Sequence, residues 1–332
     1  MNLNHPKVKF GKTGVLLINL GTPDSTSWLD IRKYLKEFLS DRRVIEVNPI
    51  IWQIILNLFI LTFRPSKTAK AYKEIWMKDI NMSPLKYFTE MQTKKLGIQI
   101  NSEKIIVDYA MRYGNPSIKG KMKKLQKEGC ENLIILPLYP QYAAATTATV
   151  CDEVYRSLMK MRWQPSLQII PHYESEPLYI EALVNSINKK ISEIKWKPDL
   201  IVASYHGIPK KYFDKGDPYQ CYCQKTSRLI TDKFKKIPIK TTFQSRFGPQ
   251  EWLQPYTDKT FETLPGEGKK NILVICPGFS SDCVETLEEI LIQGKESFLK
   301  SGGENFDLIP CLNDNDDHIN LINNLVSSYL KN

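Results

Sequence analysis

The sequence predicts an α/β fold in which two related halves each contain a doubly wound parallel β-sheet, and three features support this. Short apolar runs rich in β-branched residues recur along the chain, and helical patterns fill the intervals between them. The runs are continuous rather than alternating, which is typical of parallel strands buried on both faces. Three short motifs of the first half also recur, in the same order, in the second half.

We expect eight strands from these apolar runs. They cover residues 14–20, 104–110, 132–138, 167–170, 199–205, 239–243, 271–276 and 306–309. Helical patterns lie between them, for example at residues 28–39, 116–128, 177–194, 223–234 and 283–299. Alternation of strands and helices predicts parallel sheets, and ligands of such sheets bind at the carboxyl ends of the strands.

The recurring motifs indicate an internal repeat. They are Gly21-Thr-Pro23 and Gly207-Ile-Pro209, Arg112-Tyr-Gly114 and Arg246-Phe-Gly248, and Pro140-Gln-Tyr142 and Pro277-Gly-Phe279. The paired motifs are separated by 186, 134 and 137 residues, so the first half should contain an insertion of about fifty residues. Residues 24–83 are the candidate insertion. We place the two domains at residues 1–165 and 166–332, the second ending in a C-terminal helix.

The composition is that of a globular protein with a large core. Of 332 residues, 42% are hydrophobic and 25% are charged, and the formal net charge is +10. The lysines are spread along the chain, so we expect a mildly basic surface and no nucleic-acid partner. Seven cysteines, an odd number, favour a reducing compartment over a disulfide framework. Residues 1–12 contain no secretory signal, so we expect a cytoplasmic protein. We also expect a monomer.

One apolar segment, residues 50–63, raises the question of membrane contact. It is fourteen residues long, whereas a spanning helix needs ~20 apolar residues. Two interpretations remain open, a buried helix that lines a pocket and a helix that lies on a membrane surface. Basic residues flank the segment and suit an anionic membrane face: Arg42, Arg43, Arg64, Lys67, Lys70 and Lys73.

His206 is the first candidate functional residue. It follows the buried run at residues 200–204, and Gly207 and Pro209 come directly after it. A histidine at the end of a strand lies at the mouth of the sheet, where neutral imidazole can accept a proton or bind a metal. Gly207 would let the backbone turn or a ligand come close. The other three histidines, His5, His172 and His318, lack this placement, and we interpret them as structural or surface residues.

A second constellation combines a strand end with acidic residues. The strand at 271–276 is followed by Pro-Gly and then by Asp282, Glu285 and Glu289. Residues three or four apart share one face of a helix, so these carboxylates should lie together. Such a group can relay protons or transfer a divalent cation, although Asp282 is also well placed to cap the helix.

Aromatic and polar residues follow several other strands. A flat, partly anionic ligand would suit them, with arginines pairing its carboxylates and rings packing on its plane. These residues are Arg112, Tyr113, Tyr139, Tyr142, Thr146, Thr147, Gln244, Ser245, Arg246 and Trp252. No phosphate loop or dinucleotide fingerprint is present, and the lone Cys221-Tyr-Cys223 lacks a second pair at zinc spacing.

Ordered blocks of residues over nearly the whole chain resemble the ferrochelatase family. They are Leu16-Leu-Ile-Asn-Leu-Gly-Thr-Pro23, Phe38-Leu-Ser-Asp41, Ser83-Pro-Leu85, Arg112-Tyr-Gly-Asn-Pro116, Leu138-Tyr-Pro-Gln-Tyr142, Tyr205-His-Gly-Ile-Pro209, Gly216-Asp-Pro-Tyr219, Gln244-Ser-Arg-Phe-Gly-Pro249, Trp252-Leu253, Pro277-Gly-Phe279 and Asp282-Cys-Val-Glu-Thr-Leu287. The order of the blocks, rather than any one of them, carries the resemblance.

The resemblance implies two Rossmann-like domains separated by a cleft, and insertion of Fe²⁺ into protoporphyrin IX to form protohaem. It implies that His206 and Glu285 form the active-site pair and metal ligands, supported by Asp282, with Glu289 in a proton or metal relay. It also implies that Leu20, Arg112, Tyr113 and Trp252 line the porphyrin cleft. Residues 50–63 resemble the family's apolar lip, which would bring the protein to the inner face of the membrane.

Two departures from the family pattern change these expectations. Some relatives bind a [2Fe–2S] cluster, but here the internal cysteine position is Ala144 and residues 318–332 lack cysteine, so no cluster or other cofactor is expected. Some relatives have histidine at Cys283 and a carboxylate at Gln293, so the acidic relay should be shorter here. Two other functions stay open: a chelatase for another metal or porphyrin, such as coproporphyrin III, and a non-catalytic porphyrin or haem carrier.

Overall fold

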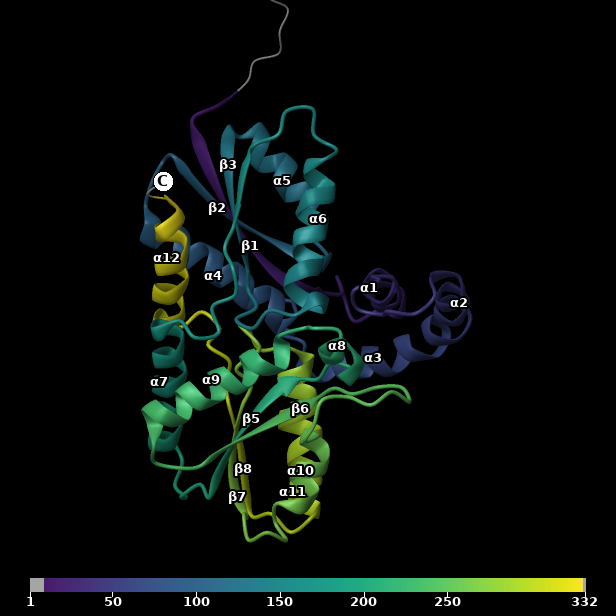
Figure 1. Cartoon of the computed structure of the whole chain (residues 1–332), viewed down its shortest axis with the longest axis vertical. Helices are drawn as coiled ribbons and strands as arrows, with labels where there is room; N and C mark the ends of the chain where they lie inside the picture. Colours follow the sequence, from purple (N-terminus) through teal and green to yellow (C-terminus); the bar gives the residue numbers. More distant parts are fainter. Residues whose placement is uncertain (1–8, 331–332) are drawn as a thin grey trace, which may run out of the picture.

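The computed structural model describes residues 9–330, and eight strands form two separate parallel sheets within them (Figure 1). The first sheet has the order β2-β1-β3-β4 and the second β6-β5-β7-β8. The strands are β1 (Lys12–Thr22), β2 (Ile105–Gly114), β3 (Cys130–Pro137), β4 (Ser166–Ile169), β5 (Leu200–His206), β6 (Ile239–Gln244), β7 (Asn271–Ile275) and β8 (Asn305–Ile309). All eight predicted strands and the predicted doubly wound fold are confirmed. Residues 1–8, with His5 and most of the segment that bears on a secretory signal, lie outside the described part.

The two sheets have the same strand order, which supports the repeat inferred from the three motifs. Each motif lies at the carboxyl end of the equivalent strand in both halves: β1 and β5, β2 and β6, β3 and β7. Gly21 shows why a motif needs glycine. Its φ is +113°, and a Cβ there would lie 1.8 Å from the carbonyl oxygen of Tyr113 on the neighbouring strand.

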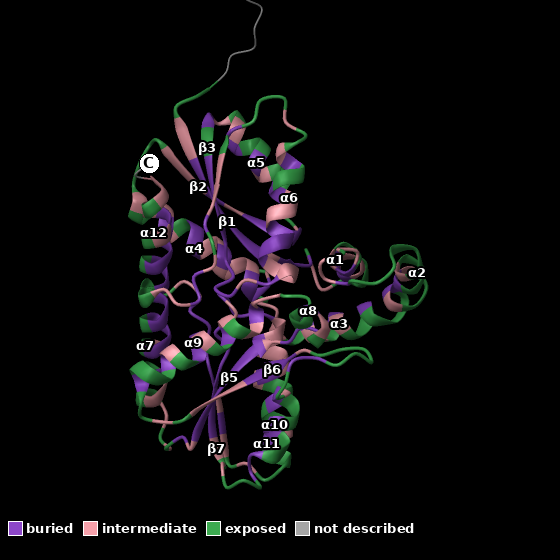
Figure 2. Cartoon of the chain, viewed as in Figure 1, coloured by how far each residue is buried: buried purple, intermediate pink, exposed green. Residues whose placement is uncertain are grey.

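Helices cover both faces of both sheets and bury most of the central strands, as Figure 2 shows, whereas the edge strand β4 contains no buried residue. Val15 and Leu17 of β1 pack in a core that also receives Ile201 and Ala203 of β5. This shared core joins the two sheets. Because these strands are buried on both faces, their sequences are continuous apolar runs. The principal helices are α4 (Pro84–Ile100), α5 (Ile118–Lys127), α6 (Thr149–Leu158), α7 (Pro177–Glu193), α8 (Lys210–Asp214), α9 (Tyr219–Phe234), α10 (Thr257–Thr263), α11 (Lys295–Lys300) and α12 (Asp316–Leu330).

Two contacts bear on the boundary drawn at residue 165. β4 pairs with β3, so Ser166–Ile169 belongs to the first sheet although it was assigned to the second domain. The C-terminal helix α12 packs against α4 and β3 of the first half as well as against α7. The sheet boundary therefore follows β4, while the division into two domains stays a prediction.

The insertion in the first half folds as a helical lip. It comprises α1 (Trp28–Leu39), α2 (Pro49–Ile55), the π-helical turn η1 (Leu56–Ile60) and α3 (Leu61–Ile75), whereas only α8 and α9 separate the matching strands of the second half. The helix at Pro49–Ile75 has 27 residues and a mean hydropathy of 1.2 over its most apolar stretch, 17% of which is buried. By length and composition it could cross a membrane, so the expectation that it is too short was wrong; the helix continues twelve residues past the apolar segment.

One face of this helix packs on the protein and the other faces solvent. Leu56 and Leu61 are fully buried, whereas Ile50, Leu58 and Phe63 are 74%, 62% and 72% exposed. Figure 2 shows α2 exposed along most of its length. One face of the segment is thus buried in the protein, while the other is free to contact a membrane, and that contact stays a proposal.

Candidate functional site

His206 is the last residue of β5, at the mouth of the second sheet, and is half-buried. Its Nδ1 lies 2.7 Å from the carbonyl oxygen of Gly207. A carbonyl oxygen only accepts hydrogen bonds, so Nδ1 must carry the proton in the neutral ring. The lone pair on Nε2 is then free to accept a proton or bind a metal.

Gly207 allows two strands to meet closely beside this histidine. A Cβ at Gly207 would lie 2.9 Å from the carbonyl oxygen of Gln244 and 3.2 Å from the Trp252 ring. The backbone of Gln244 and the Trp252 ring therefore approach Gly207. From the sequence, a ligand could have come close to this glycine instead.

Glu285 and Glu289 lie on a π-helix, η3 (Glu285–Gly294), where the sequence predicted an ordinary helix. Gln244 on β6 is paired with His206 in the register of β5 and β6. Its Nε2 donates to the carbonyl oxygen of Glu285 at 2.8 Å and to Oε2 of Glu289 at 3.2 Å. The Gln244 amide thus joins the end of β6 to the backbone of Glu285 and to the carboxylate of Glu289.

The environment of Glu289 suits a carboxyl that exchanges protons. Burial raises its pKa and the nearby charge of Glu285 raises it further, while hydrogen bonds from Ser245 and the charge of His206 oppose the increase. Its Oε1 accepts the backbone N–H of Ser245 at 2.7 Å, and Oε2 accepts the Ser245 hydroxyl. Glu289 therefore holds a proton more readily than an exposed glutamate, close to a histidine.

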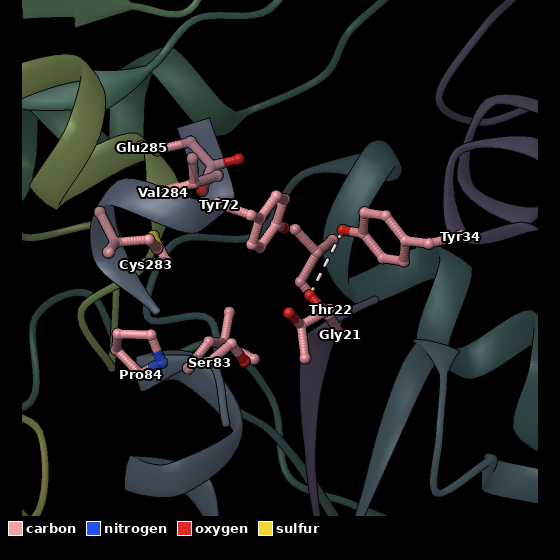
Figure 3. Close-up of a pocket in the computed structure, with 12 residues that line it drawn as sticks. Gly21, Thr22, Tyr34, Tyr72, Ser83, Pro84, Cys283, Val284 and Glu285 are labelled. Atoms are coloured by element: carbon pink, nitrogen blue, oxygen red, sulfur yellow. Dashed lines mark hydrogen bonds between the residues drawn. The ribbon is translucent and has the colours of Figure 1, made fainter. Parts of the chain in front are cut away.

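Glu285 also faces the first half of the protein. A cavity of about 10 Å³, room for about one water molecule, separates Glu285 and Cys283 from Thr22 and Tyr34 (Figure 3). The Tyr34 hydroxyl donates to the carbonyl oxygen of Gly21 at 3.3 Å. The negative charge of Glu285 contributes to the raised pKa values of Tyr34 and Tyr72, after the larger effect of burial. Glu285 thus lies at the junction of the two predicted cleft walls.

Beyond Glu289, a second cavity of about 480 Å³ opens toward solvent. Glu289 and Gln293 line it, together with Arg246 and Asp258, which form a 2.8 Å ion pair. The cavity is a water-accessible exit beside the carboxylate. Gln293 lies where some relatives have a further carboxylate, so Glu289 is the acid of η3 that lines this cavity.

Asp282 lies elsewhere than predicted. It precedes the helix, is 5% exposed, and its carboxylate accepts hydrogen bonds from Asn313 at 2.6 Å, Thr286 at 3.1 Å and the N–H of Cys311 at 3.2 Å. Within residues 9–330 no hydrogen bond joins it to Glu285. The expected shared helix face is therefore absent, and Asp282 anchors the loop that leads to Glu285.

The four predicted porphyrin contacts differ in accessibility. Leu20 is half-buried and lines the small cavity with Glu285. Arg112, Tyr113 and Trp252 are only 8%, 0% and 5% exposed. Arg112 and Tyr113 both hydrogen-bond to Asp41, and Trp252 donates to the carbonyl oxygen of Phe247 at 3.0 Å. These three side chains are buried and bonded to other groups of the protein, and their contact with porphyrin stays a prediction.

Arg64 was noted only as a basic flank of the apolar segment. It is exposed on α3, and its guanidinium lies 5.4 Å from the centroid of the Phe247 ring, across the two halves. Protein around the group lowers its pKa, and the charge of Glu285 partly offsets this. A cationic side chain near Glu285 could not be identified from sequence, because nothing in its local pattern distinguishes Arg64 from the lysines that follow.

The remaining candidates lie apart from this site. His318 is buried, its Nδ1 lies 2.6 Å from the Asn313 carbonyl oxygen, and burial lowers its pKa to about 4, so the structural interpretation is confirmed. His172 is half-exposed and pairs with Glu174 at 2.6 Å. Cys221 is exposed whereas Cys223 is buried, so the two thiols occupy different environments.

Comparison of the sequence with known proteins adds evidence from relatives. The family model described as Ferrochelatase matches residues 12–330. The ferrochelatase of Allorhizobium ampelinum is 54% identical over 330 residues, covering 98% of this chain and 96% of that protein. The ferrochelatase of Rhizobium meliloti is 54% identical over 333 residues, covering 99% and 98%.

Solved structures with the same fold are more distant. SirB from Bacillus subtilis with Fe³⁺ superimposes with a TM-score of 0.57 at 11% identity, covering 96% of this chain and 95% of SirB. CbiX, described as the terminal enzyme for biosynthesis of sirohaem in denitrifying bacteria, has a TM-score of 0.51 at 11% identity, covering 95% and 98%. These matches support the chelatase-like fold, and the full-length match to relatives establishes that the chain belongs to the ferrochelatase family.

Proposed function

We propose that this protein acts as a ferrochelatase, a lyase that inserts Fe²⁺ into protoporphyrin IX to form protohaem in the last step of haem biosynthesis. The carrying observation is the identity of about half of all residues with ferrochelatases over their full length. His206, Glu285 and Glu289 of the second half offer the groups that this reaction needs, and the charges of His206 and Glu285 both act on Glu289.

Metal insertion requires removal of two protons from the porphyrin. A free porphyrin carries two inner N–H groups, and its nitrogen lone pairs lie in the ring plane. The ring must bend so that the lone pairs point toward the metal, and a site complementary to the bent ring favours this. We assign His206 Nε2 as the base that accepts a porphyrin proton, because Nδ1 is committed to the Gly207 carbonyl oxygen.

The carboxylates would serve the metal and the departing protons. His206 and Glu285 offer nitrogen and oxygen ligands that suit Fe²⁺ before its transfer. Glu289, with its raised pKa and its place on the solvent-open cavity, would pass protons outward or receive the metal. Asp282 acts through the loop that it anchors, as a positioning residue for Glu285.

The porphyrin would lie between the two halves. Leu20 offers an apolar contact, and Arg112, Tyr113 and Trp252 would back the walls or turn toward the ring when the cleft opens. Arg64 is the exposed guanidinium beside this region and suits a porphyrin carboxylate. No cofactor is assigned, and Ala144 gives no thiolate for an iron–sulfur cluster. We propose that the protein works as a cytoplasmic monomer.

A metal and porphyrin panel tests this function. Purified protein is mixed with Fe²⁺, Co²⁺ or Zn²⁺ and with protoporphyrin IX or coproporphyrin III, and the product is followed by its absorption spectrum. We expect insertion of Fe²⁺ into protoporphyrin IX. Preference for coproporphyrin III or cobalt would favour the related chelatase, and tight porphyrin retention without turnover would favour a carrier.

His206→Ala tests the proposed base. The variant should lose insertion by a factor on the order of 10² or more while still binding porphyrin, measured by fluorescence quenching. His172→Ala removes a half-exposed histidine far from the site and serves as the matched control. Full activity of His206→Ala would exclude the assignment.

We also propose that the exposed face of the lip contacts an anionic membrane. Ile51, Ile54, Leu58 and Phe63 are each more than half exposed on this helix, which basic residues flank. Such an amphipathic helix lies in the membrane interface with its apolar face inserted. Because Leu56 and Leu61 are fully buried in the protein, we favour a helix lying on the inner face of the membrane over a spanning one.

Vesicle sedimentation checks the membrane proposal. The double variant Ile54→Ser, Leu58→Ser should bind phosphatidylglycerol vesicles at least about tenfold more weakly, since each buried aliphatic side chain contributes roughly 1.5–3 kcal/mol. Met159→Ser, at a residue 80% exposed directly after α6, is the control. Equal binding by both variants would rule out the lip as the contact surface.

A further inference from the structure

A buried amide in the first half contacts the loops of the second half that lead to Glu285. Gln92 lies on α4 and is fully buried. Its Nε2 lies 3.2 Å from the Ser280 carbonyl oxygen, 3.0 Å from the Ser281 hydroxyl oxygen and 2.8 Å from the Asn313 carbonyl oxygen. One side-chain nitrogen therefore ties α4 to two separate loops at the carboxyl edge of the second sheet.

The orientation of this amide follows from its partners. The two carbonyl oxygens can only accept, so the amide nitrogen, and not the amide oxygen, must face them. The Gln92 Oε1 is buried and has no hydrogen-bond partner among residues 9–330. An amide that leaves its own oxygen unpaired in the protein interior is unfavourable, so the stabilisation must come from the three contacts of its nitrogen.

These contacts continue to the active-site pair. Asn313 donates to Asp282 Oδ2 at 2.6 Å and accepts the Asp282 N–H at 2.8 Å. Asp282 in turn accepts the hydroxyl of Thr286, the residue after Glu285, at 3.1 Å. The path from Gln92 thus runs through buried polar groups to the first turn of the π-helix.

The same network reaches the opposite wall. Asn19 Nδ2 lies 3.3 Å from the Ser280 hydroxyl oxygen and 3.0 Å from Thr89 Oγ1 on α4. The side-chain oxygen of Asn19 accepts the N–H of Leu20 at 2.9 Å, and Leu20 lines the cavity that Glu285 faces. A shift of the loop at Ser280 would therefore change the separation between Leu20 and Glu285.

We propose that Gln92 is a positioning residue for metal insertion, setting the placement of Glu285 against the first-half wall; this rests on the proposed chelatase function. Gln92 touches neither porphyrin nor metal. It acts by holding the loop with Ser280 and Ser281 and the loop with Asn313 at a fixed distance from α4. A displacement of about 1 Å at a reacting group can lower a rate by on the order of 10².

Gln92→Met tests the proposal, with Gln99→Met as matched control. Methionine keeps the length and apolar volume but removes the two amide N–H groups that these three acceptors share. Gln99 lies on the same helix and donates to Asn320 Oδ1 of α12 at 3.0 Å, but its contact is exposed and leads away from Glu285. For Gln92→Met, kcat should fall roughly 10–100-fold while the KM for protoporphyrin stays within about twofold. Gln99→Met should match the wild type in both.

A double variant separates positioning from a general structural effect. If Gln92 acts through Glu285, adding Gln92→Met to Glu285→Gln should lower kcat no further, because the two changes affect one unit. Independent, multiplicative losses would overturn the proposal, as would wild-type kcat in Gln92→Met. If Gln92→Met fails to fold, Gln92→Asn, which shortens the side chain by one methylene, should also lower kcat, but by less.

Hydrogen–deuterium exchange keeps this inference distinguishable from the proposed function. Backbone N–H groups of residues 280–287 should exchange faster in Gln92→Met than in Gln99→Met or the wild type, with or without substrates. Unchanged exchange there would overturn the inference. A wild-type protein inert toward every metal and porphyrin would instead overturn the proposed function, while the exchange still reports on Gln92.

Discussion

Two arginines occupy matching places at the ends of β2 and β6, yet their surroundings differ. Arg112 pairs with Asp41, their side chains are 7% and 12% exposed, and the Tyr113 ring lies 4.3 Å from the guanidinium. Arg246 pairs with Asp258, their side chains are 39% and 54% exposed, and the Tyr256 ring lies 4.2 Å away. Each arginine thus has an acidic and an aromatic partner, although Asp41 lies in the insertion of the first half and Asp258 on α10 of the second, and the two ion pairs differ in burial.

The π-helical turns that follow β3 and β7 differ in the chemical type of their side chains. The first, η2 (Ala144–Ala148), contains only alanine and threonine, whereas η3 contains Glu285, Glu288 and Glu289. The acidic residues of these turns are therefore on the second wall, and the buried ion pair is on the first. Ligands of this fold bind at the strand ends, and we propose that the first wall stabilises the site while the second carries the reacting groups.

The largest effect should come from the acid of the second wall. Glu285→Gln keeps the shape of the side chain but removes its charge and its capacity to accept a proton. We expect kcat for Fe²⁺ insertion to fall by on the order of 10²–10⁴ with little change in melting temperature. Ala145→Ser in η2, at the matching turn of the first wall, should leave kcat within about twofold.

Steady-state kinetics and thermal denaturation of both variants check this contrast. Comparable kcat losses in Glu285→Gln and Ala145→Ser would show that both walls contribute to the reaction. A large fall in the melting temperature of Glu285→Gln would mean that this carboxylate stabilises the fold instead.

The two ion pairs should differ in stability rather than activity. Asp41→Asn leaves the buried Arg112 charge without its partner and should lower the free energy of unfolding by about 3 kcal/mol. Asp258→Asn removes the exposed partner of Arg246 and should change it by less than about 1 kcal/mol. Urea denaturation of both variants measures the difference. Equal losses would contradict the claim that burial separates the two arginines.

The sequence was sufficient to predict the strands and the strand end at which His206 lies. β1 alternates Val15 and Leu17 toward one core with Leu16 and Ile18 toward another, so a continuous apolar run is what a strand buried on both faces requires. His206 was found because it directly follows such a run. Local pattern carries this information, since strand formation and strand ends depend on neighbouring residues.

Properties that depend on distant residues could not be predicted in this way. Arg112 resembles a ligand-binding arginine until Asp41, 71 residues earlier, is seen to pair with it. Asp282 resembles a member of an acidic helix face until Asn313 and Cys311 are seen to hold its carboxylate. Gln92 carried no signal at all, because a glutamine in a helix is ordinarily a surface residue.

A smaller effect is expected from pH, through Glu289 on the second wall. Its pKa in the folded protein is raised above the ordinary value of 4.5, chiefly by burial. Folding therefore favours the protonated carboxyl. The stability that this group contributes is complete below pH 4.5 and is lost as pH rises through the folded-state pKa. Glutamine at this position stays neutral, so the Glu289→Gln variant lacks this pH dependence.

Urea denaturation of both proteins between pH 4.5 and 8 checks the sign. The free energy of unfolding of the wild type, relative to Glu289→Gln, should decrease as pH rises, by less than the loss expected for Asp41→Asn because Glu289 keeps solvent contact. Parallel curves would mean that Glu289 has an ordinary pKa. In that case the proton exit would depend on His206 alone, and the contrast between a reactive and a stabilising wall would rest on Glu285.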